Sequence, residues 1–185
     1  MLVGMATFEH LPIRVGGLAE AVTSLAEALS KQDEVYIFMP SHGLIRQSPE
    51  LNFKKFADFW ITVGEHVYPL TIYEFWRERV RIFLFSNEVM DHPEVYHPRE
   101  IFIQKLVHFT KGLPGLINLL LKQERRKPQV LHINDWHCVF SGALVKKYFR
   151  IPFVYTIHRI CREKMSVKEL NEVNLGELVD NRYLE

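Results

Sequence analysis

Cysteine is scarce in this chain, and long apolar runs are missing. Only two of the 185 residues are cysteines, Cys138 and Cys161, and their lack of paired spacing excludes the disulfide framework of a small secreted scaffold. No apolar run approaches the ~20 residues that a membrane-spanning helix needs. Met1 leads directly into an apolar segment without the charged region of a signal peptide. We therefore expect a soluble, cytoplasmic protein with no membrane partner.

An excess of charge of one sign is also lacking. The 23 basic and 22 acidic residues are well mixed and give a net charge of +1. A protein that binds nucleic acid through its phosphates needs a basic face, so nucleic acid is not an expected partner. The densest basic cluster, residues 122–127, precedes Pro128. We interpret it as a solvated helix end, where positive charge opposes the helix dipole.

Several catalytic signatures are absent from the sequence. It has no G-x-S-x-G, no Walker loop and no complete G-x-G-x-x-G, so nothing supports a hydrolase, a P-loop protein or a dinucleotide-binding protein. His132, His137 and His158 raise the question of zinc. Their spacings fit no common ligand pattern, and no cysteine or glutamate completes a set. We expect no metal and no cofactor.

The N-terminal segment predicts a strand–helix–strand unit. Residues 2–7 form an apolar run, residues 18–29 repeat apolar side chains at helical spacing, and residues 35–39 are rich in β-formers and end at Pro40. Strands joined through a helix are parallel and connected by a right-handed crossover. With 48% apolar residues, the chain has enough apolar surface for the core of one globular domain.

The middle of the chain has a different pattern. Three β-branched and aromatic runs, residues 59–63, 66–75 and 80–85, indicate antiparallel hairpins beside the main sheet. The last of these runs is expected to return the chain to the central sheet. Residues 91–99 form a loop that carries two prolines.

The second half alternates helical and strand patterns. Residues 100–122 predict a long helix, and Gly112, Pro114 and Gly115 predict a kink or break within it. The elements expected after it are a strand, a helix, a strand and one short helix, at residues 129–133, 136–148, 153–157 and 167–178. We therefore predict an α/β fold: a Rossmann-like, doubly wound, mostly parallel sheet with an inserted antiparallel hairpin region.

The run Arg14-Val15-Gly16-Gly17-Leu18 lies between the first strand and the first helix. Glycines at this point leave room for a ligand to approach the backbone. The N–H groups that open the helix form a partly positive anion site, and Arg14 adds a mobile charge. These features favour a phosphate or a diphosphate sugar as ligand. The alternative is a Gly-Gly pair that only closes a tight turn.

Polar loops follow four predicted strands, at residues 9–18, 40–43, 132–137 and 155–159. Ligands of open α/β sheets bind beyond the carboxyl ends of the strands. We therefore expect these four loops to outline one crevice at a single edge of the sheet.

An Asp-Trp pair in the third loop suits a carbohydrate. Asp135 can hold hydroxyl groups, while Trp136 can pack on the C–H face of a sugar. The alternative is that Asp135 is only a helix N-cap and Trp136 only a core residue. His158 is interpreted as a hydrogen-bonding residue at a strand end.

These segments resemble the glycogen and starch synthases, retaining glycosyltransferases built from two Rossmann-like domains around a deep cleft. The matching stretches are FEHLPIRVGGLAEAV (8–22), PSHG (40–43), HINDWHCVFSGALVKKYF (132–149) and IPFVYTIHR (151–159). They occur in the family's order and at its approximate spacing. The resemblance covers Leu2 to about Arg159 and is closest to the compact archaeal-type synthases.

The resemblance implies an activity and a set of site residues. The family transfers glucose from ADP-glucose or UDP-glucose to the non-reducing end of an α-1,4-glucan, with retention. Asp135 and His158 then take the catalytic positions, near the acceptor and at the reacting sugar. The implied substrate-binding residues are Glu9, Arg14, Gly16, Gly17, Trp136, His137 and Arg159. Arg14 occupies the position of a lysine in the family, so a planar guanidinium group replaces a compact ammonium group near the phosphates.

Half of the family's architecture has no counterpart in this sequence. The resemblance makes residues 1–185 a single, incomplete N-terminal domain on the acceptor side, and the C-terminal nucleotide-binding domain is absent. We expect the isolated chain to be inactive toward its two partners, the α-glucan acceptor and the nucleotide-sugar donor. The alternatives are a stand-alone, non-catalytic glucan-binding module and a degenerate gene product. An exposed cleft wall could also pair two copies in a homo-oligomer.

Overall fold

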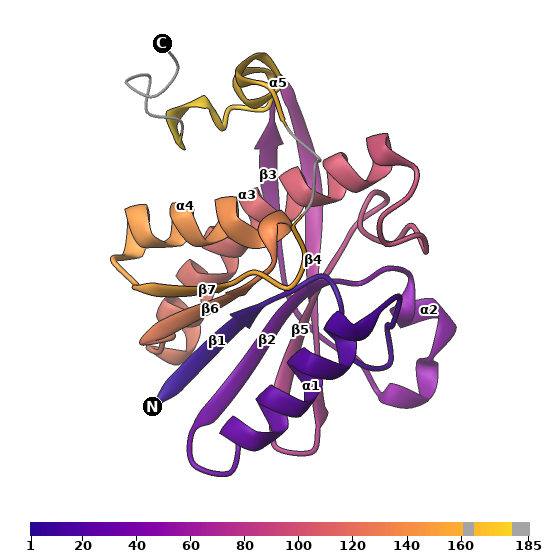
Figure 1. Cartoon of the computed structure of the whole chain (residues 1–185), viewed down its shortest axis with the longest axis vertical. Coiled ribbons are helices and arrows are strands. Elements are labelled where there is room, and N and C mark those ends of the chain that lie inside the picture. The colour runs from indigo at the N-terminus through magenta and orange to yellow at the C-terminus, as the bar shows by residue number, and fades with distance from the viewer. Residues whose placement is uncertain (161–164, 179–185) are drawn as a thin grey trace.

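The computed structural model describes residues 1–160 and 165–178, and within these ranges its centre is one seven-stranded sheet (Figure 1). The strands are β1 (Leu2–Ala6), β2 (Glu34–Pro40), β3 (Lys54–Val63), β4 (His66–Arg77), β5 (Val80–Ser86), β6 (Val130–Asn134) and β7 (Phe153–Thr156). Their order is β3-β4-β5-β2-β1-β6-β7. β1 pairs in parallel with β2 and β6, β2 with β5, and β6 with β7. The predicted, mostly parallel α/β sheet is confirmed.

The antiparallel hairpins are also confirmed, and they continue the same sheet. β3 pairs antiparallel with β4, and β4 with β5. Leu84 and Phe85 of β5 lie opposite Met39 and Pro40 of β2. The last hairpin strand therefore returns the chain to the central sheet, as the sequence predicts.

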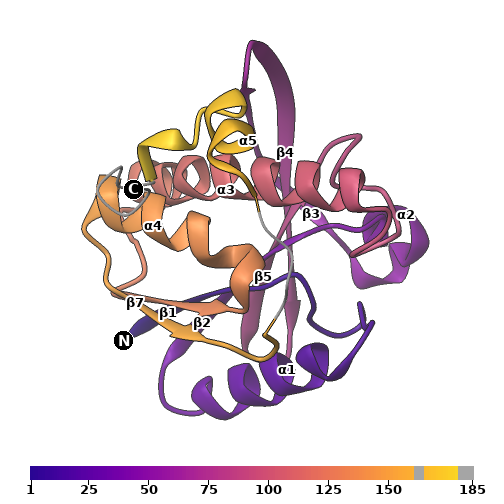
Figure 2. The same cartoon turned by 45° about the horizontal axis from the view of Figure 1, so that its top comes forward.

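Helices cover both faces of the sheet, as in a doubly wound fold. α1 (Gly17–Leu29) packs on one face, and α3 (Arg99–Glu124) and α4 (Val139–Phe149) pack on the other (Figures 1 and 2). Two shorter helices are α2 (Leu44–Gln47) and α5 (Val167–Glu172). α1 is amphipathic, because Leu18, Val22 and Ala26 recur at helical spacing and are buried.

Two apolar clusters fill the space between the sheet and its helices. In β2, Val35 and Ile37 belong to the cluster under α1, whereas Tyr36 and Phe38 belong to the cluster under α3 and α4. Successive residues of a strand point to opposite faces, so β2 is buried on both sides. This explains why its sequence is a continuous apolar run rather than an alternating one.

The predicted break in the long helix does not occur, because α3 runs unbroken from Arg99 to Glu124 with Pro114 inside it. Proline removes one helical N–H donor and costs roughly 3 kcal/mol in a helix interior. That cost is offset by burial, since the residues around Pro114 are fully buried: Leu113, Leu116, Ile117 and Leu120. The neighbouring glycine serves close packing. A Cβ on Gly112 would lie 2.7 Å from Leu70 Cδ2.

The segment after β7 holds less helix than predicted. α5 ends at Glu172, and a separate 3₁₀ turn covers Gly176–Leu178, so the single helix expected over residues 167–178 is wrong in its length. The chain leaves the helical conformation at Asn174, whose φ of 59° is left-handed. The start of α5 is well defined, because Ser166 and Glu169 form a capping box.

Two expectations from composition can be placed on the structure. Cys138 is buried with a free thiol, and burial raises the pKa of that thiol well above its usual range. Cys138 is therefore unreactive, while Cys161 lies outside the described residues. Among the helices of the described ranges, none is both long and apolar enough to cross a membrane.

Candidate functional site

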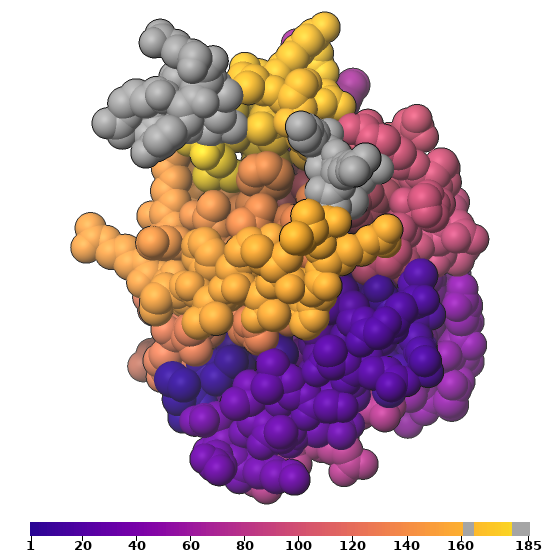
Figure 3. Space-filling model, in the orientation of Figure 1, coloured from indigo at the N-terminus to yellow at the C-terminus, as the bar shows by residue number. Residues whose placement is uncertain are grey.

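A pocket of about 700 Å³ lies at the carboxyl edge of the sheet, beyond the ends of β1, β6 and β7. Its walls come from the loop between β1 and α1, the segment that leads into α3, and the loops after β6 and β7. The space-filling view shows the indigo surface of the first loop beside the orange surface of the segment around β7 (Figure 3). The pocket has the size and the position of a small-molecule site in an open α/β sheet.

Eight of the nine predicted site residues line this pocket: Glu9, Gly16, Gly17, Asp135, Trp136, His137, His158 and Arg159. The ninth, Arg14, does not. Its Nη1 lies 2.6 Å from Oε1 of Glu20, and its side chain is 60% exposed. The structure thus brings together residues that lie in three distant parts of the sequence, and their roles remain predictions.

The two glycines at the start of α1 are not required by the backbone. Gly16 is the N-cap, with φ −143° and ψ −160°, and Gly17 is the first helical residue. Neither has a positive φ, and a Cβ added to either would meet no atom within 4 Å. The expected tolerance of positive φ is therefore not used here. What the glycines provide is open space in front of the N-terminus of α1, where none of the described side chains caps the helix.

The carboxylate of Glu9 is bound by the protein itself. Its Oε2 accepts hydrogen bonds from the N–H groups of Val15 at 2.7 Å and Gly16 at 2.8 Å. Its Oε1 accepts one from the phenol of Tyr96 at 2.6 Å. Glu9 is 2% exposed. Glu9 therefore stabilises the turn before α1 through hydrogen bonds to the backbone of that turn.

Asp135 has an unusual backbone. Its φ of 68° and ψ of 167° lie in a region that glycine visits and other residues rarely adopt. Its N–H donates to the carbonyl of Thr156 at 2.9 Å, and its carboxylate accepts from the N–H of Trp136 at 3.0 Å. One carboxylate oxygen of Asp135, Oδ1, therefore acts as the predicted N-cap, at the start of the 3₁₀ turn Trp136–Cys138. Burial is nearly complete, with 5% of the residue exposed at the pocket.

Aromatic rings form one side of the pocket. Trp136 lies edge-on to Phe102, with ring centroids 5.4 Å apart, and Tyr96 lies edge-on to His137 at 5.7 Å. Residues 94–97, Arg99 and Phe102 all line the pocket. This segment was not predicted as part of the site, because residues 91–99 have the sequence pattern of a loop with two prolines.

The histidines of the site differ in environment. Burial, assisted by His158, lowers the pKa of His137 to about 3, so His137 is neutral, and its Nε2 has no hydrogen-bond partner among the described residues. His158 Nε2 lies 3.1 Å from Oδ1 of Asn134 and donates to it. Nε2 of His132 lies 2.7 Å from the hydroxyl of Thr156. Within the part of the chain that is described, no group of His, Cys, Asp or Glu could hold a metal ion.

The fourth predicted loop, residues 40–43, does not line the pocket. Ser41 and His42 are buried, and Ser41 bonds the carbonyl of Met90. His42 Nε2 donates to the carbonyl of Phe8 at 3.0 Å, and its Nδ1 accepts from Lys105 at 2.8 Å. The loop therefore contacts residues that lie next to the pocket lining and does not face the pocket itself. Lys105, which is fully buried, was also missed, although it lies at helical spacing between the apolar Phe102 and Phe109.

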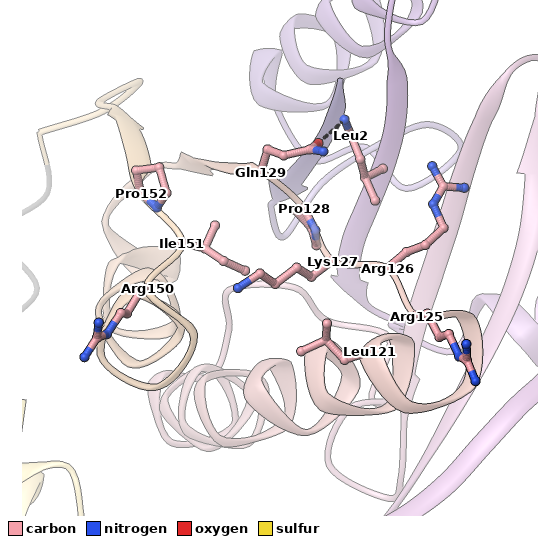
Figure 4. A pocket seen from close by; sticks show the side chains of 10 residues that line it. All are labelled: Leu2, Leu121, Arg125, Arg126, Lys127, Pro128, Gln129, Arg150, Ile151 and Pro152. Carbon is pink, nitrogen blue, oxygen red and sulfur yellow. Dashed lines mark hydrogen bonds between the residues drawn. The ribbon is translucent and has the colours of Figure 1, made fainter.

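A second cavity of about 530 Å³ lies at the opposite edge of the sheet, near the amino ends of β1, β6 and β7 (Figure 4). Four basic residues line it: Arg125, Arg126, Lys127 and Arg150. Arg126 pairs with Glu34, and Lys127 donates to the carbonyl of Phe149 at 2.9 Å. In Figure 4 the guanidinium groups of Arg125 and Arg150 point away from the centre of the cavity. The basic groups do not converge on one point, which agrees with a solvated helix end.

Sequence comparisons are in line with this geometry. Residues 3–182 match the family of the starch synthase catalytic domain. The chain is 26% identical over 179 residues to a glycogen synthase of Clostridium novyi, which covers 92% of this chain and 37% of that protein. It is 25% identical over 189 residues to a glycogen synthase of Exiguobacterium sibiricum, covering 97% of this chain and 38% of that protein. The chain thus spans little more than a third of the length of these relatives.

The fold is similar to that of a solved structure, the catalytic domain of starch synthase IV from Arabidopsis thaliana bound to ADP and acarbose. The TM-score is 0.69 at 18% identity, covering 85% of this chain and 34% of that chain. At this identity the likeness concerns the fold alone. Because the family match extends over nearly the whole sequence, the chain belongs to the starch synthase catalytic domain family of glycosyltransferases.

Proposed function

We propose that this chain is the acceptor-side, N-terminal domain of a glycogen or starch synthase. The complete enzyme transfers glucose from ADP-glucose or UDP-glucose to the non-reducing end of an α-1,4-glucan, with retention. The proposal includes cytoplasmic localisation and a closer relation to the compact archaeal-type synthases. Residues 1–185 then form an incomplete unit, which binds glucan but does not turn over without a nucleotide-binding domain.

One observation carries this proposal. The open space at Gly16 and Gly17 faces the same pocket as Asp135, Trp136 and His158. The N-terminus of a helix stabilises negative charge, and a carboxylate beside an aromatic ring suits the hydroxyls and the C–H face of a sugar. Both halves of a sugar diphosphate therefore find suitable groups in one cavity.

Each residue would have a separate role in the transfer reaction, according to its chemistry. The N–H groups that open α1 at Gly17 would face the leaving diphosphate. His158 would hold the reacting sugar in place, and Asp135, near the acceptor, would help to stabilise the positive charge that develops at the anomeric carbon. Trp136 would hold the acceptor sugar. Arg14 reaches the phosphates only after it leaves Glu20, and an exposed ion pair of this kind contributes little stability.

Titration of the 185-residue chain with maltooligosaccharides, by calorimetry and by NMR, tests the proposal. We expect binding in the millimolar range or tighter, with signal changes at Trp136 and Asp135. Trp136→Phe should weaken binding about tenfold. Trp76→Phe is the matched control, because Trp76 is an exposed tryptophan on β4 that does not line the pocket. Absence of binding at millimolar sugar would overturn the proposal.

A second measurement addresses turnover. The chain is mixed with glycogen and either ADP-glucose or UDP-glucose, and release of the nucleoside diphosphate is followed. We expect none, because the pocket provides only one wall of the cleft that the reaction requires. Measurable release by the purified chain contradicts the assignment as an acceptor-side half.

A further inference from the structure

Lys105 is a fully buried lysine on the inner face of α3. Its ammonium group lies 2.5 Å from the carbonyl oxygen of His92, 2.7 Å from that of Glu94 and 2.8 Å from Nδ1 of His42. An ammonium group has three hydrogen-bond donors. All three are used, two of them on the backbone of the segment that leads into the pocket.

His42 extends this contact to the end of β1. Since Nδ1 of His42 accepts from Lys105, the ring is neutral and its Nε2 carries the proton that is donated to the carbonyl of Phe8. Burial and the nearby Lys105 hold the pKa of His42 well below its usual range, in agreement with this assignment. Phe8 directly precedes Glu9, whose carboxylate binds the turn before α1.

A second connection joins the same two segments. Tyr96, two residues after Glu94, donates its phenol to Glu9, and Glu9 in turn accepts from the N–H groups of Val15 and Gly16. The segment of residues 92–96 is therefore tied at one end to Lys105 and at the other end to the Gly-Gly turn. No apolar side chain at position 105 could bind the two carbonyls.

We propose that Lys105 is a positioning residue, which fixes residues 92–96 so that Tyr96 reaches Glu9 and Glu9 holds the turn at Gly16. The effect on sugar binding rests on the proposed function, whereas the effect on the turn does not. A buried ammonium is costly for the fold, and burial lowers the pKa of Lys105 to about 8. A position that served packing alone would be filled as well by methionine.

Amide hydrogen exchange of the 185-residue chain, followed by NMR, tests this role in Lys105→Met. We expect exchange at Val15 and Gly16 to accelerate about tenfold or more, because the chain of hydrogen bonds that protects them is broken. Exchange in the central strand β2 should change much less. Lys111→Met is the matched control: it lies on the same helix, and its ammonium group binds the carbonyl of Asn174 at 2.7 Å, away from the pocket.

The outcomes separate a local role from a general one. Unchanged exchange at Val15 and Gly16 in folded Lys105→Met overturns the proposal, and so does an equal acceleration at these amides and in β2. If Lys105→Met does not fold, Lys105→Gln replaces it, because its amide has two N–H donors and cannot replace all three hydrogen bonds of the ammonium group. Unchanged exchange at Val15 in that variant likewise overturns the proposal.

Maltooligosaccharide affinity gives the independent readout. Lys105→Met should weaken sugar binding about tenfold while Lys111→Met leaves it unchanged, since only Lys105 contacts the pocket wall. A wild-type chain that binds no sugar contradicts the proposed function, and the exchange measurement then still decides the role of Lys105. Fast exchange with unchanged affinity overturns the part of the proposal that concerns the sugar.

Discussion

The phenol of Tyr96 donates a 2.6 Å hydrogen bond to the carboxylate of Glu9, across 87 residues of sequence. Burial and this carboxylate raise the pKa of Tyr96 well above its usual range, so the phenol keeps its proton. The contact joins the segment before α3 to the turn before α1. Glu9, which was predicted to bind substrate, therefore accepts its hydrogen bonds from donors of the protein itself.

Removal of this phenol should destabilise the fold. A hydrogen bond to a buried carboxylate contributes about 2 kcal/mol, so Tyr96→Phe is expected to lower the free energy of unfolding by that amount. Urea denaturation measures it. Tyr148→Phe is the control, because Tyr148 donates to Glu177 on the surface at 2.9 Å, and its loss should cost ~0.5 kcal/mol or less. Equal effects of the two substitutions would refute the prediction.

Low pH should decrease the free energy of unfolding, because several histidines are buried in their neutral form. Burial lowers the pKa of His10 and His108 to about 4 and that of His137 to about 3, from 6.5 in the unfolded chain. The unfolded chain therefore binds more protons than the folded one between pH 6.5 and about 4. This stabilisation is complete above pH 6.5 and is lost as the pH falls through this window.

Urea denaturation at pH 7.0 and at pH 4.5 measures this loss, which we expect to reach a few kcal/mol. His108→Gln serves as the matched variant, since glutamine can accept a hydrogen bond from Asn87 but cannot take up a proton. Its stability should fall less steeply with acid. A slope equal to that of the wild-type chain would show that His108 does not contribute.

Gly112 should not tolerate a methyl group. A Cβ at this position would lie 2.7 Å from Leu70 Cδ2 and 3.0 Å from Phe85 Cδ1. Alanine gains about 1 kcal/mol in helix propensity, but overpacking a core costs typically 1–3 kcal/mol. We expect Gly112→Ala to lower the melting temperature, measured by calorimetry.

Gly17→Ala is the matched control for that substitution. Gly17 also lies in a helix, and a Cβ there meets no atom within 4 Å. The melting temperature should stay the same or rise slightly, because only the propensity gain remains. A fall as large as that of Gly112→Ala would mean that this glycine serves the fold rather than the pocket.

Local sequence patterns account for most of the fold. Apolar and β-branched runs, helical spacing and turn residues predict β1, β2, β4, β5 and α1 close to their observed positions. The strand β3 begins at Lys54, five residues before the predicted run. Pro114 shows where such patterns fail: its local preference for a break is overcome by the burial of its neighbours against the sheet. The cost of one missing hydrogen bond is smaller than the gain from a full apolar face.

The site was predictable where the residues follow strands and unpredictable where they depend on distant partners. Asp135 and His158 come directly after β6 and near the end of β7, and the rule for sheet edges places them together. Tyr96 has no local signal, since its partner Glu9 is 87 residues away. Lys105 did have one, because a lysine at i+3 from Phe102 on the apolar face of a helix must find buried acceptors.

The backbone of Asp135, with its positive φ, has a consequence for sequence variation at this position. In a library of all twenty amino acids at position 135, selection for folding alone should enrich glycine, which adopts such dihedral angles without strain. Selection for sugar affinity should instead return aspartate, as deep sequencing of both pools would reveal. At this residue, selection for thermodynamic stability and selection for ligand affinity therefore favour different amino acids.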